Sequence, residues 1–163
     1  MIARLGALLL VLAGGLALAG GAGAQARRQP PYWASIASGD AMMRAGPGTN
    51  YPAQWRYVRR DLPVRVVGVY EQWRQIEDPD GTTGWMLVNL LSDERTAIVR
   101  GDAPRPMHER GDAAAPVRFR AEPGVVGRIS RCGSGWCRLD VRGRAGFIRI
   151  EHVWGVSPGE TVD

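Results

Sequence analysis

The chain has 163 residues, of which 21 are basic and 16 acidic, giving a formal net charge of +5 at pH 7. Every basic residue is an arginine, and the arginines alternate with Asp and Glu along the chain. So small and dispersed an excess argues against a nucleic-acid-binding protein. No window sustains the apolar spacing of an amphipathic helix, which argues against a helical fold.

Residues 1–26 have the pattern of a secretory signal peptide. Arg4 precedes the apolar run Leu5–Ala19, and small residues at Ala24 and Ala26 offer two possible cleavage points. The alternative is a transmembrane anchor, but the run is short for the ~20 residues that a span requires and is rich in Gly and Ala. We therefore predict an exported protein of the periplasm or the exterior, with no stable membrane span after cleavage.

The remaining residues of the first half contain short strand-like runs separated by turn residues. Gly46-Pro47-Gly48 should turn the chain sharply, Asp78–Gly81 should form a hairpin turn, and Val88–Leu91 should close the unit as one helical turn. The predicted strands are Tyr32–Ala37, Ala41–Arg44, Gln54–Val58, Pro63–Tyr70, Trp73–Glu77 and Thr82–Leu87.

After a polar boundary at Ser92–Arg95 the same order of runs begins again. Trp136 and Gly146 repeat the spacing of Trp73 and Gly84 to within one residue, which indicates an internal repeat. The predicted strands are Thr96–Val99, Met107–Glu109, Pro116–Arg120, Val125–Ile129, Trp136–Leu139 and Gly146–Ile148. Short strands at this spacing favour two small all-β barrels.

Barrels of about 60 residues bury little surface, so large rings should supply much of each core. We expect five tryptophans to contribute: Trp55, Trp73, Trp85, Trp136 and Trp154. The two copies should pack together or share a strand through Ile98-Val99.

The first half resembles the bacterial SH3 (SH3b) family. The resemblance is carried by Arg44–Gly48 with Tyr51-Pro52, by Trp73–Ile76, and by Gly84-Trp85 followed by Leu90-Leu91. It implies an all-β fold of two tandem SH3-like barrels, the first over residues 33–93 and a second, divergent one over residues 98–159. The family is mostly non-catalytic and occurs in envelope and cell-wall proteins.

The two cysteines, Cys132 and Cys137, flank a Gly-Ser-Gly-Trp segment. In an oxidising compartment the first interpretation is a disulfide across a hairpin. Three alternatives stay open: a redox pair, a zinc site, which would need two further ligands, and a Cys–His nucleophile. His108 and His152 lie far from the cysteines in sequence and are most simply surface or strand-end residues.

Other signals for chemistry are incomplete. Asp78, Asp80 and Gly81 match only part of a calcium loop, and Gly46-x-Gly48 precedes no helix that could hold a phosphate. Ser134 does not lie in a Gly-x-Ser-x-Gly motif. We therefore expect no metal, no cofactor and no catalytic residues.

Binding is the function that the sequence favours. Tyr51, Trp55 and Trp73 could line a cleft beside the long loop, where Arg44 or Arg56 could meet a carboxylate. The competing interpretation places Trp55 and Trp73 in the core and Tyr51 against its own loop.

The expected ligand is a cell-wall peptide, a peptidoglycan fragment or an envelope protein. The alternative function is an accessory subunit that docks onto an envelope enzyme. A third hypothesis, an envelope hydrolase, would rest on Cys137, His108 or His152.

Overall fold

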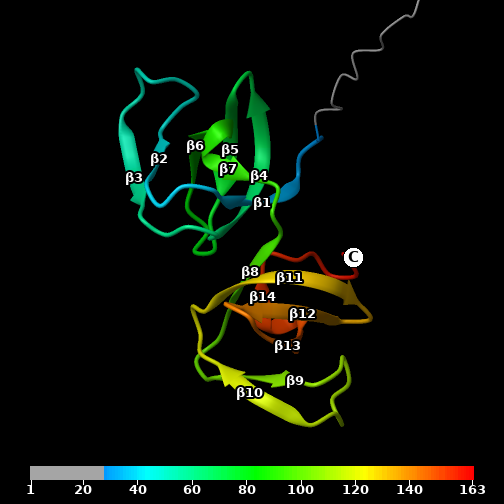
Figure 1. Ribbon diagram of the computed structural model, residues 1–163. Coiled ribbons are helices and arrows are strands. Elements are labelled where there is room, and N and C mark those ends of the chain that lie inside the picture. The colour runs from blue at the N-terminus through cyan, green and yellow to red at the C-terminus, as the bar shows by residue number, and fades with distance from the viewer. Residues whose placement is uncertain (1–27) are drawn as a thin grey trace, which may run out of the picture.

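The computed structural model describes residues 28–163, and the predicted signal peptide lies outside them. The described chain is almost entirely β, with two seven-stranded antiparallel sheets and two single-turn 3₁₀ helices. Each sheet curls into its own barrel, with the first above the second in Figure 1. The predicted all-β fold of two tandem SH3-like barrels is confirmed. None of the helices within residues 28–163 is both long and apolar enough to span a lipid bilayer.

The first sheet has the strand order β3-β2-β6-β5-β4-β1-β7. Its strands are β1 (Tyr32–Ile36), β2 (Ala41–Arg44), β3 (Ala53–Tyr57), β4 (Pro63–Tyr70), β5 (Trp73–Glu77), β6 (Thr83–Leu87) and β7 (Leu91–Ser92). The helix η1 (Val88–Leu90) links β6 to β7, where one helical turn was expected.

The second sheet has the order β10-β9-β13-β12-β11-β8-β14. Its strands are β8 (Thr96–Val99), β9 (Arg105–His108), β10 (Val117–Ala121), β11 (Val126–Gly133), β12 (Trp136–Val141), β13 (Arg144–Arg149) and β14 (Val153–Trp154). The helix η2 (Ile150–His152) precedes β14. The second sheet has the same strand order as the first, with each strand number larger by seven, so the predicted internal repeat is present.

Each barrel has a separate apolar core, as the alternation of its strands predicts. The first core is built mainly from Ile36, Met43, Val64, Val66, Ile76 and Met86. The second is built mainly from Val99, Met107, Cys137, Leu139, Ile148 and Val153.

The five tryptophans that were expected to contribute to the cores differ in how far they are buried. Trp73 and Trp136 are buried, and Trp85 and Trp154 are half-buried. Trp55, however, is 57% exposed, so its predicted place in the core was wrong. It shares a face with the buried Tyr57, but β3 is the edge strand of its sheet and has no neighbour on one side to cover the ring.

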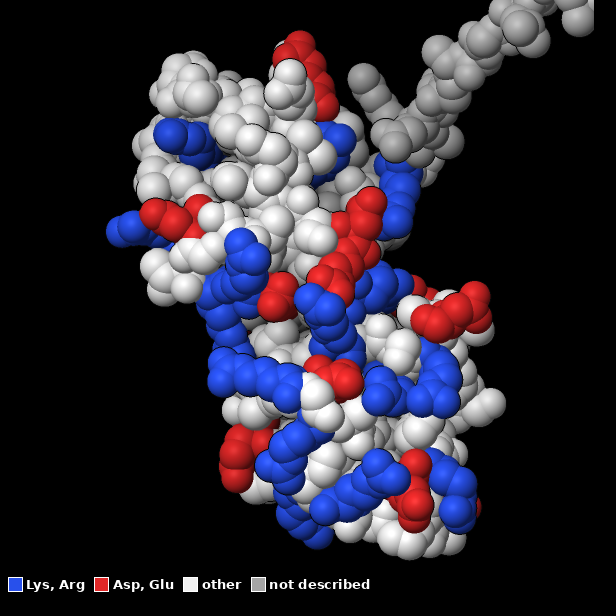
Figure 2. Space-filling view, viewed as in Figure 1, with Lys and Arg blue, Asp and Glu red and all other residues white. Residues whose placement is uncertain are grey.

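The two barrels pack together without sharing a strand. The ring of Trp33 meets that of Trp154 edge-on, with centroids 4.7 Å apart, and its Nε1 donates to Ser157 Oγ (2.9 Å). Arg59 donates to the carbonyl oxygen of Gly124 (2.8 Å). Strand β8 belongs wholly to the second sheet, so sharing through Ile98-Val99 was the wrong alternative. Figure 2 shows basic and acidic side chains gathered where the barrels meet.

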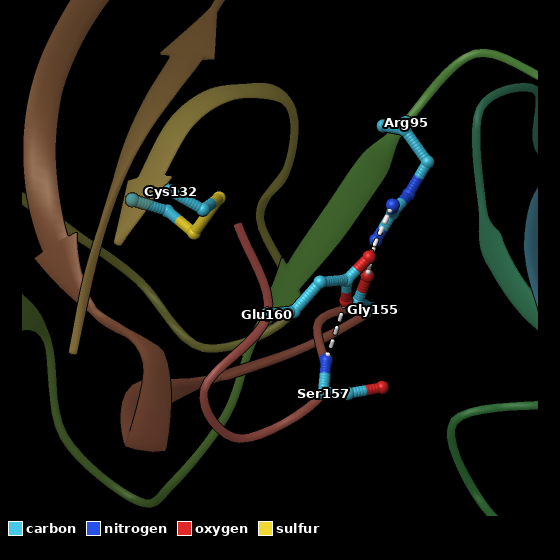
Figure 3. The surroundings of a disulfide bond; sticks show 6 residues. Arg95, Cys132, Gly155, Ser157 and Glu160 are labelled. Carbon is cyan, nitrogen blue, oxygen red and sulfur yellow. Dashed lines mark hydrogen bonds and ion pairs between the residues drawn. A yellow bond between two sulfur atoms is a disulfide. The ribbon is translucent and has the colours of Figure 1, made fainter. Parts of the chain in front are cut away.

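The predicted disulfide is formed between Cys132 and Cys137 and joins β11 to β12 (Figure 3). Cys132 also pairs with Val162 through two backbone hydrogen bonds, which places the C-terminal segment against the disulfide. Because Cys137 is bonded to sulfur in this state, it carries no free thiol that could act as a nucleophile or a zinc ligand.

The C-terminal segment (residues 155–163) also binds the connector between the barrels (residues 93–95). The Glu160 carboxylate accepts hydrogen bonds from the Arg95 guanidinium (2.6 Å) and the Ser157 amide (2.8 Å), and Arg95 donates to the Gly155 carbonyl oxygen (Figure 3). Burial alone would raise the pKa of Glu160, but these hydrogen bonds and the Arg95 charge outweigh it and lower that pKa. The charged form of Glu160 therefore stabilises the contact.

Candidate binding site

The loop between β2 and β3 is closed by two hydrogen bonds and by one aromatic ring. Arg44 Nη1 donates to the carbonyl oxygen of Tyr51 (2.7 Å), and the Ala45 amide donates to the Pro52 carbonyl oxygen. A Cβ added at Gly46 would lie 2.5 Å from the Tyr51 ring, so the ring packs directly on the glycine backbone. Tyr51 nevertheless stays 42% exposed, which leaves part of it available to a ligand.

Strand register places Arg44 and Trp73 on one side of the first sheet. Arg44 on β2 is opposite Trp85 on β6, which in turn is opposite Gln75 on β5. Two residues away along β5 and β6, Trp73 is opposite Leu87. Opposed residues share a face, and so do residues two apart, so these five lie on the face of the first sheet that points away from its core, which we call the outer face. Trp73 is buried on this face. The intervening side chains point into the core: Met43, Ile76 and Met86.

Trp55 belongs to the hairpin of β2 and β3, but it lies on the face of that hairpin opposite to Arg44. It is opposite Met43, a core residue, while Arg44 is opposite Ala53 across a register shift. The structure therefore brings Arg44 and Trp73 onto one face, with Tyr51 tied to Arg44, and leaves Trp55 on the opposite side of β3. Whether any of the four binds a ligand remains a prediction.

The second barrel contains a counterpart that the sequence reasoning missed. His108 Nδ1 donates to the Ala115 carbonyl oxygen (2.8 Å), seven residues along, as Arg44 does to Tyr51. His108 is opposite Phe147, and its ring meets Trp136 edge-on at 5.2 Å. The signal was present in the repeat, because His108 and Arg44 both end the second strand of their sheets.

The outer face of the second sheet differs in charge from that of the first. The guanidinium of Arg149 lies 4.8 Å from the centre of the Trp136 ring, and that of Arg131 lies 5.7 Å from the centre of the Phe147 ring. Such contacts cover aromatic faces with positive charge. A ligand that suits the first outer face would therefore meet a more cationic surface on the second.

The Asp78 carboxylate, part of the incomplete calcium pattern, has a structural role. It accepts hydrogen bonds from the amides of Asp80 (3.0 Å) and Thr82 (2.8 Å) and from the Tyr57 hydroxyl (2.9 Å). Burial, together with the hydrogen bond to Asp78 and its negative charge, raises the pKa of Tyr57 well above its usual value. Within residues 28–163, no three His, Cys, Asp or Glu side chains are grouped as metal ligands would be.

The comparisons with known proteins concern both barrels. The family model described as the bacterial SH3 domain matches residues 37–93 and again residues 102–155. No curated protein matches the chain.

Among solved structures, an NlpC/P60 family protein from Bacillus cereus is similar at 11% identity and a TM-score of 0.35, over 76% of this chain and 56% of that one. NlpC2 from Trichomonas vaginalis is similar at 13% identity and a TM-score of 0.34, over 78% and 49%. The chain thus spans about half the length of these structures.

Proposed function

Since the chain belongs to the bacterial SH3 domain family, we propose that it is an exported, non-catalytic binding module that recognises a cell-wall peptide or peptidoglycan fragment through its first barrel. The disulfide is in keeping with an oxidising compartment outside the cytoplasm. The ligand would contact the outer face of the first sheet and the loop between β2 and β3.

The observation that carries this proposal is the contact between Arg44 and Tyr51. One guanidinium nitrogen of Arg44 is held by the Tyr51 carbonyl oxygen, which fixes the side chain beside the half-buried ring of Trp85. A guanidinium fixed in this way loses less entropy when it takes a carboxylate in its remaining donor positions. An arginine beside aromatic rings suits a ligand that has carboxylates on a partly apolar body.

A second candidate function, docking onto an envelope enzyme as an accessory subunit, is favoured by the exposed edge of β3. Trp55 and Val58 are 57% and 71% exposed near the end of this edge strand. An edge strand with exposed apolar side chains can pair with or pack against a partner chain. On this proposal the partner meets the side of the hairpin opposite Arg44.

Co-sedimentation of the mature protein with purified cell-wall sacculi tests the first function. Arg44→Ala should reduce the bound fraction at least fivefold at low salt, while Arg65→Ala, at an exposed arginine of the first barrel, should leave it unchanged. Trp55→Ala should bind sacculi normally but lose cross-links to a partner in intact cells if the docking function is correct. Wild-type protein that stays entirely in the supernatant would exclude wall binding.

A further inference from the structure

A cleft with a volume of about 880 Å³ lies between the two barrels. The loop after β3 and the connector form part of its wall, and β11, β12 and the turn after β12 form the rest. We call it the junction cleft. Its basic residues come from both barrels and the connector: Arg59, Arg60, Arg95, Arg128, Arg138 and Arg142. Figure 2 shows basic side chains concentrated at this junction.

The cleft has a local excess of positive charge that includes free guanidinium groups. Its six arginines face three acids, namely Asp61, Glu94 and Asp140. Arg128 pairs with Glu94 (2.8 Å), and Arg138 lies 3.5 Å from Asp140. Arg60 and Arg142 make no ion pair or side-chain hydrogen bond within residues 28–163. Both are exposed, so they are available to an anion.

The floor of the cleft is formed by a paired strand surface, so its side chains are held in register. Arg128 is opposite Asp140, and Ser130 is opposite Arg138, on β11 and β12. Arg138 is also opposite Phe147 on β13. Arginines and an aromatic ring therefore follow one another on this face of the second sheet.

The backbone at the edge of the cleft is unusual at two positions. Arg142 has a φ of +54° in the two-residue turn between β12 and β13, where Asn or Gly is normally preferred. Asp61, in the loop from the first barrel, has a φ of +63°. Non-glycine residues in this conformation are uncommon and concentrate at functional sites. This turn places Arg142 at the edge of the cleft.

We propose that the junction cleft binds an acidic peptide segment of a partner protein, with carboxylates meeting guanidinium groups from both barrels. Two arginines of the second barrel already pair with carboxylates in the cleft: Arg128 with Glu94 and Arg138 with Asp140. A guanidinium fork matches a carboxylate in shape as well as in charge. The three acids of the cleft would repel a uniformly charged phosphate polymer, whereas a peptide can place its amide donors against them.

This site is separate from the one proposed for the first barrel. In Figure 1 the loop between β2 and β3 lies at the end of the first barrel away from the second. The residues that line the cleft come instead from the loop after β3, the connector and the second barrel. Changes at Arg44 should therefore leave binding in the cleft unaltered. Failure of one proposal leaves the other standing.

Fluorescence anisotropy of the mature protein with a fluorescein-labelled peptide of five Glu-Ser-Gly repeats tests the inference. The double variant Arg60→Gln/Arg142→Gln should weaken binding at least tenfold at about 50 mM NaCl. The matched control is Arg110→Gln/Arg120→Gln, which removes the same charge from two exposed arginines of the second barrel outside the cleft. This control and Arg44→Gln should each change affinity less than twofold.

Three results would overturn the proposal. The first is no binding by the wild-type protein, and the second is an equal loss in both double variants, which would indicate non-specific attraction. The third is a competition result. If polyphosphate displaces the labelled peptide at a lower concentration of negative charges than the unlabelled peptide needs, the cleft would be assigned to phosphate. Supporting results also include amide shifts on titration that centre on Arg60, Arg128 and Arg142 rather than on Arg44.

Discussion

Replacing Tyr57 with Phe removes the hydroxyl that donates to the buried Asp78 carboxylate (2.9 Å) and leaves the aromatic ring in place. A hydrogen bond to a charged acceptor contributes about 1.5–3 kcal/mol to stability, and Asp78 keeps two backbone donors. We therefore expect Tyr57→Phe to lower the free energy of unfolding by about 2 kcal/mol near pH 7. Urea unfolding followed by circular dichroism and tryptophan fluorescence measures this difference.

The same variant should show a distinct pH dependence. The pKa of Tyr57 is raised in the folded state, so its stabilising contribution is complete below the unfolded pKa of about 10 and declines as the pH rises above it. At pH 11, one unit above the unfolded pKa, the wild-type protein should have lost about 1.4 kcal/mol that the Phe variant does not lose. The difference between the two proteins should therefore shrink to below about 1 kcal/mol.

Tyr51→Phe is the matched control, because Tyr51 is exposed and its hydroxyl makes no hydrogen bond within the described part of the chain. It should change stability by less than about 0.5 kcal/mol at every pH. The reasoning would be refuted if the two variants were equally stable. It would also be refuted if the cost of Tyr57→Phe stayed constant from pH 7 to pH 11.

Three further predictions concern the C-terminal segment and the packing of the barrels. Glu160→Gln should lower the free energy of unfolding by about 1 kcal/mol at pH 7. Since the pKa of Glu160 is lowered on folding, urea unfolding should show this difference between the two proteins disappearing as the pH falls below about 4. Cys132→Ala with Cys137→Ala should cost about 2 kcal/mol for so short a loop and should speed amide exchange at Val162, while unchanged exchange would contradict the pairing described. Trp33→Ala should leave both sheets intact by circular dichroism but increase the radius of gyration in small-angle scattering; an unchanged radius would mean that other contacts suffice.

The strands were predictable where the local pattern decides them. Pro63–Tyr70 and Trp73–Glu77 were predicted with the bounds that the structure has, since the first is rich in β-branched residues and turn residues flank both. Val125–Ile129 was predicted too short. The strand β11 begins one residue later and runs to Gly133, because its end is paired across the disulfide-bonded hairpin. The polar sequence Ser130-Arg131 gives no local signal of that pairing.

The exposure of Trp55 could not be read from its neighbours. Its burial depends on whether β3 has a neighbour on both sides, and sheet order is a non-local property. The junction cleft was invisible for the same reason, because Arg60 and Arg142 come together only when the barrels pack. The Arg44–Tyr51 contact was accessible in part, since the glycines and prolines of the loop indicated a tight turn.

Through the backbone pairing of Val162 with Cys132 and the contacts of Glu160 and Ser157, residues 157–162 link the disulfide hairpin, the Arg95 connector and Trp33 of the first barrel. Truncation after Gly155 would remove the link between the Arg95 connector and the disulfide hairpin. Any gene fusion that uses the two barrels as independent units should therefore extend through Val162.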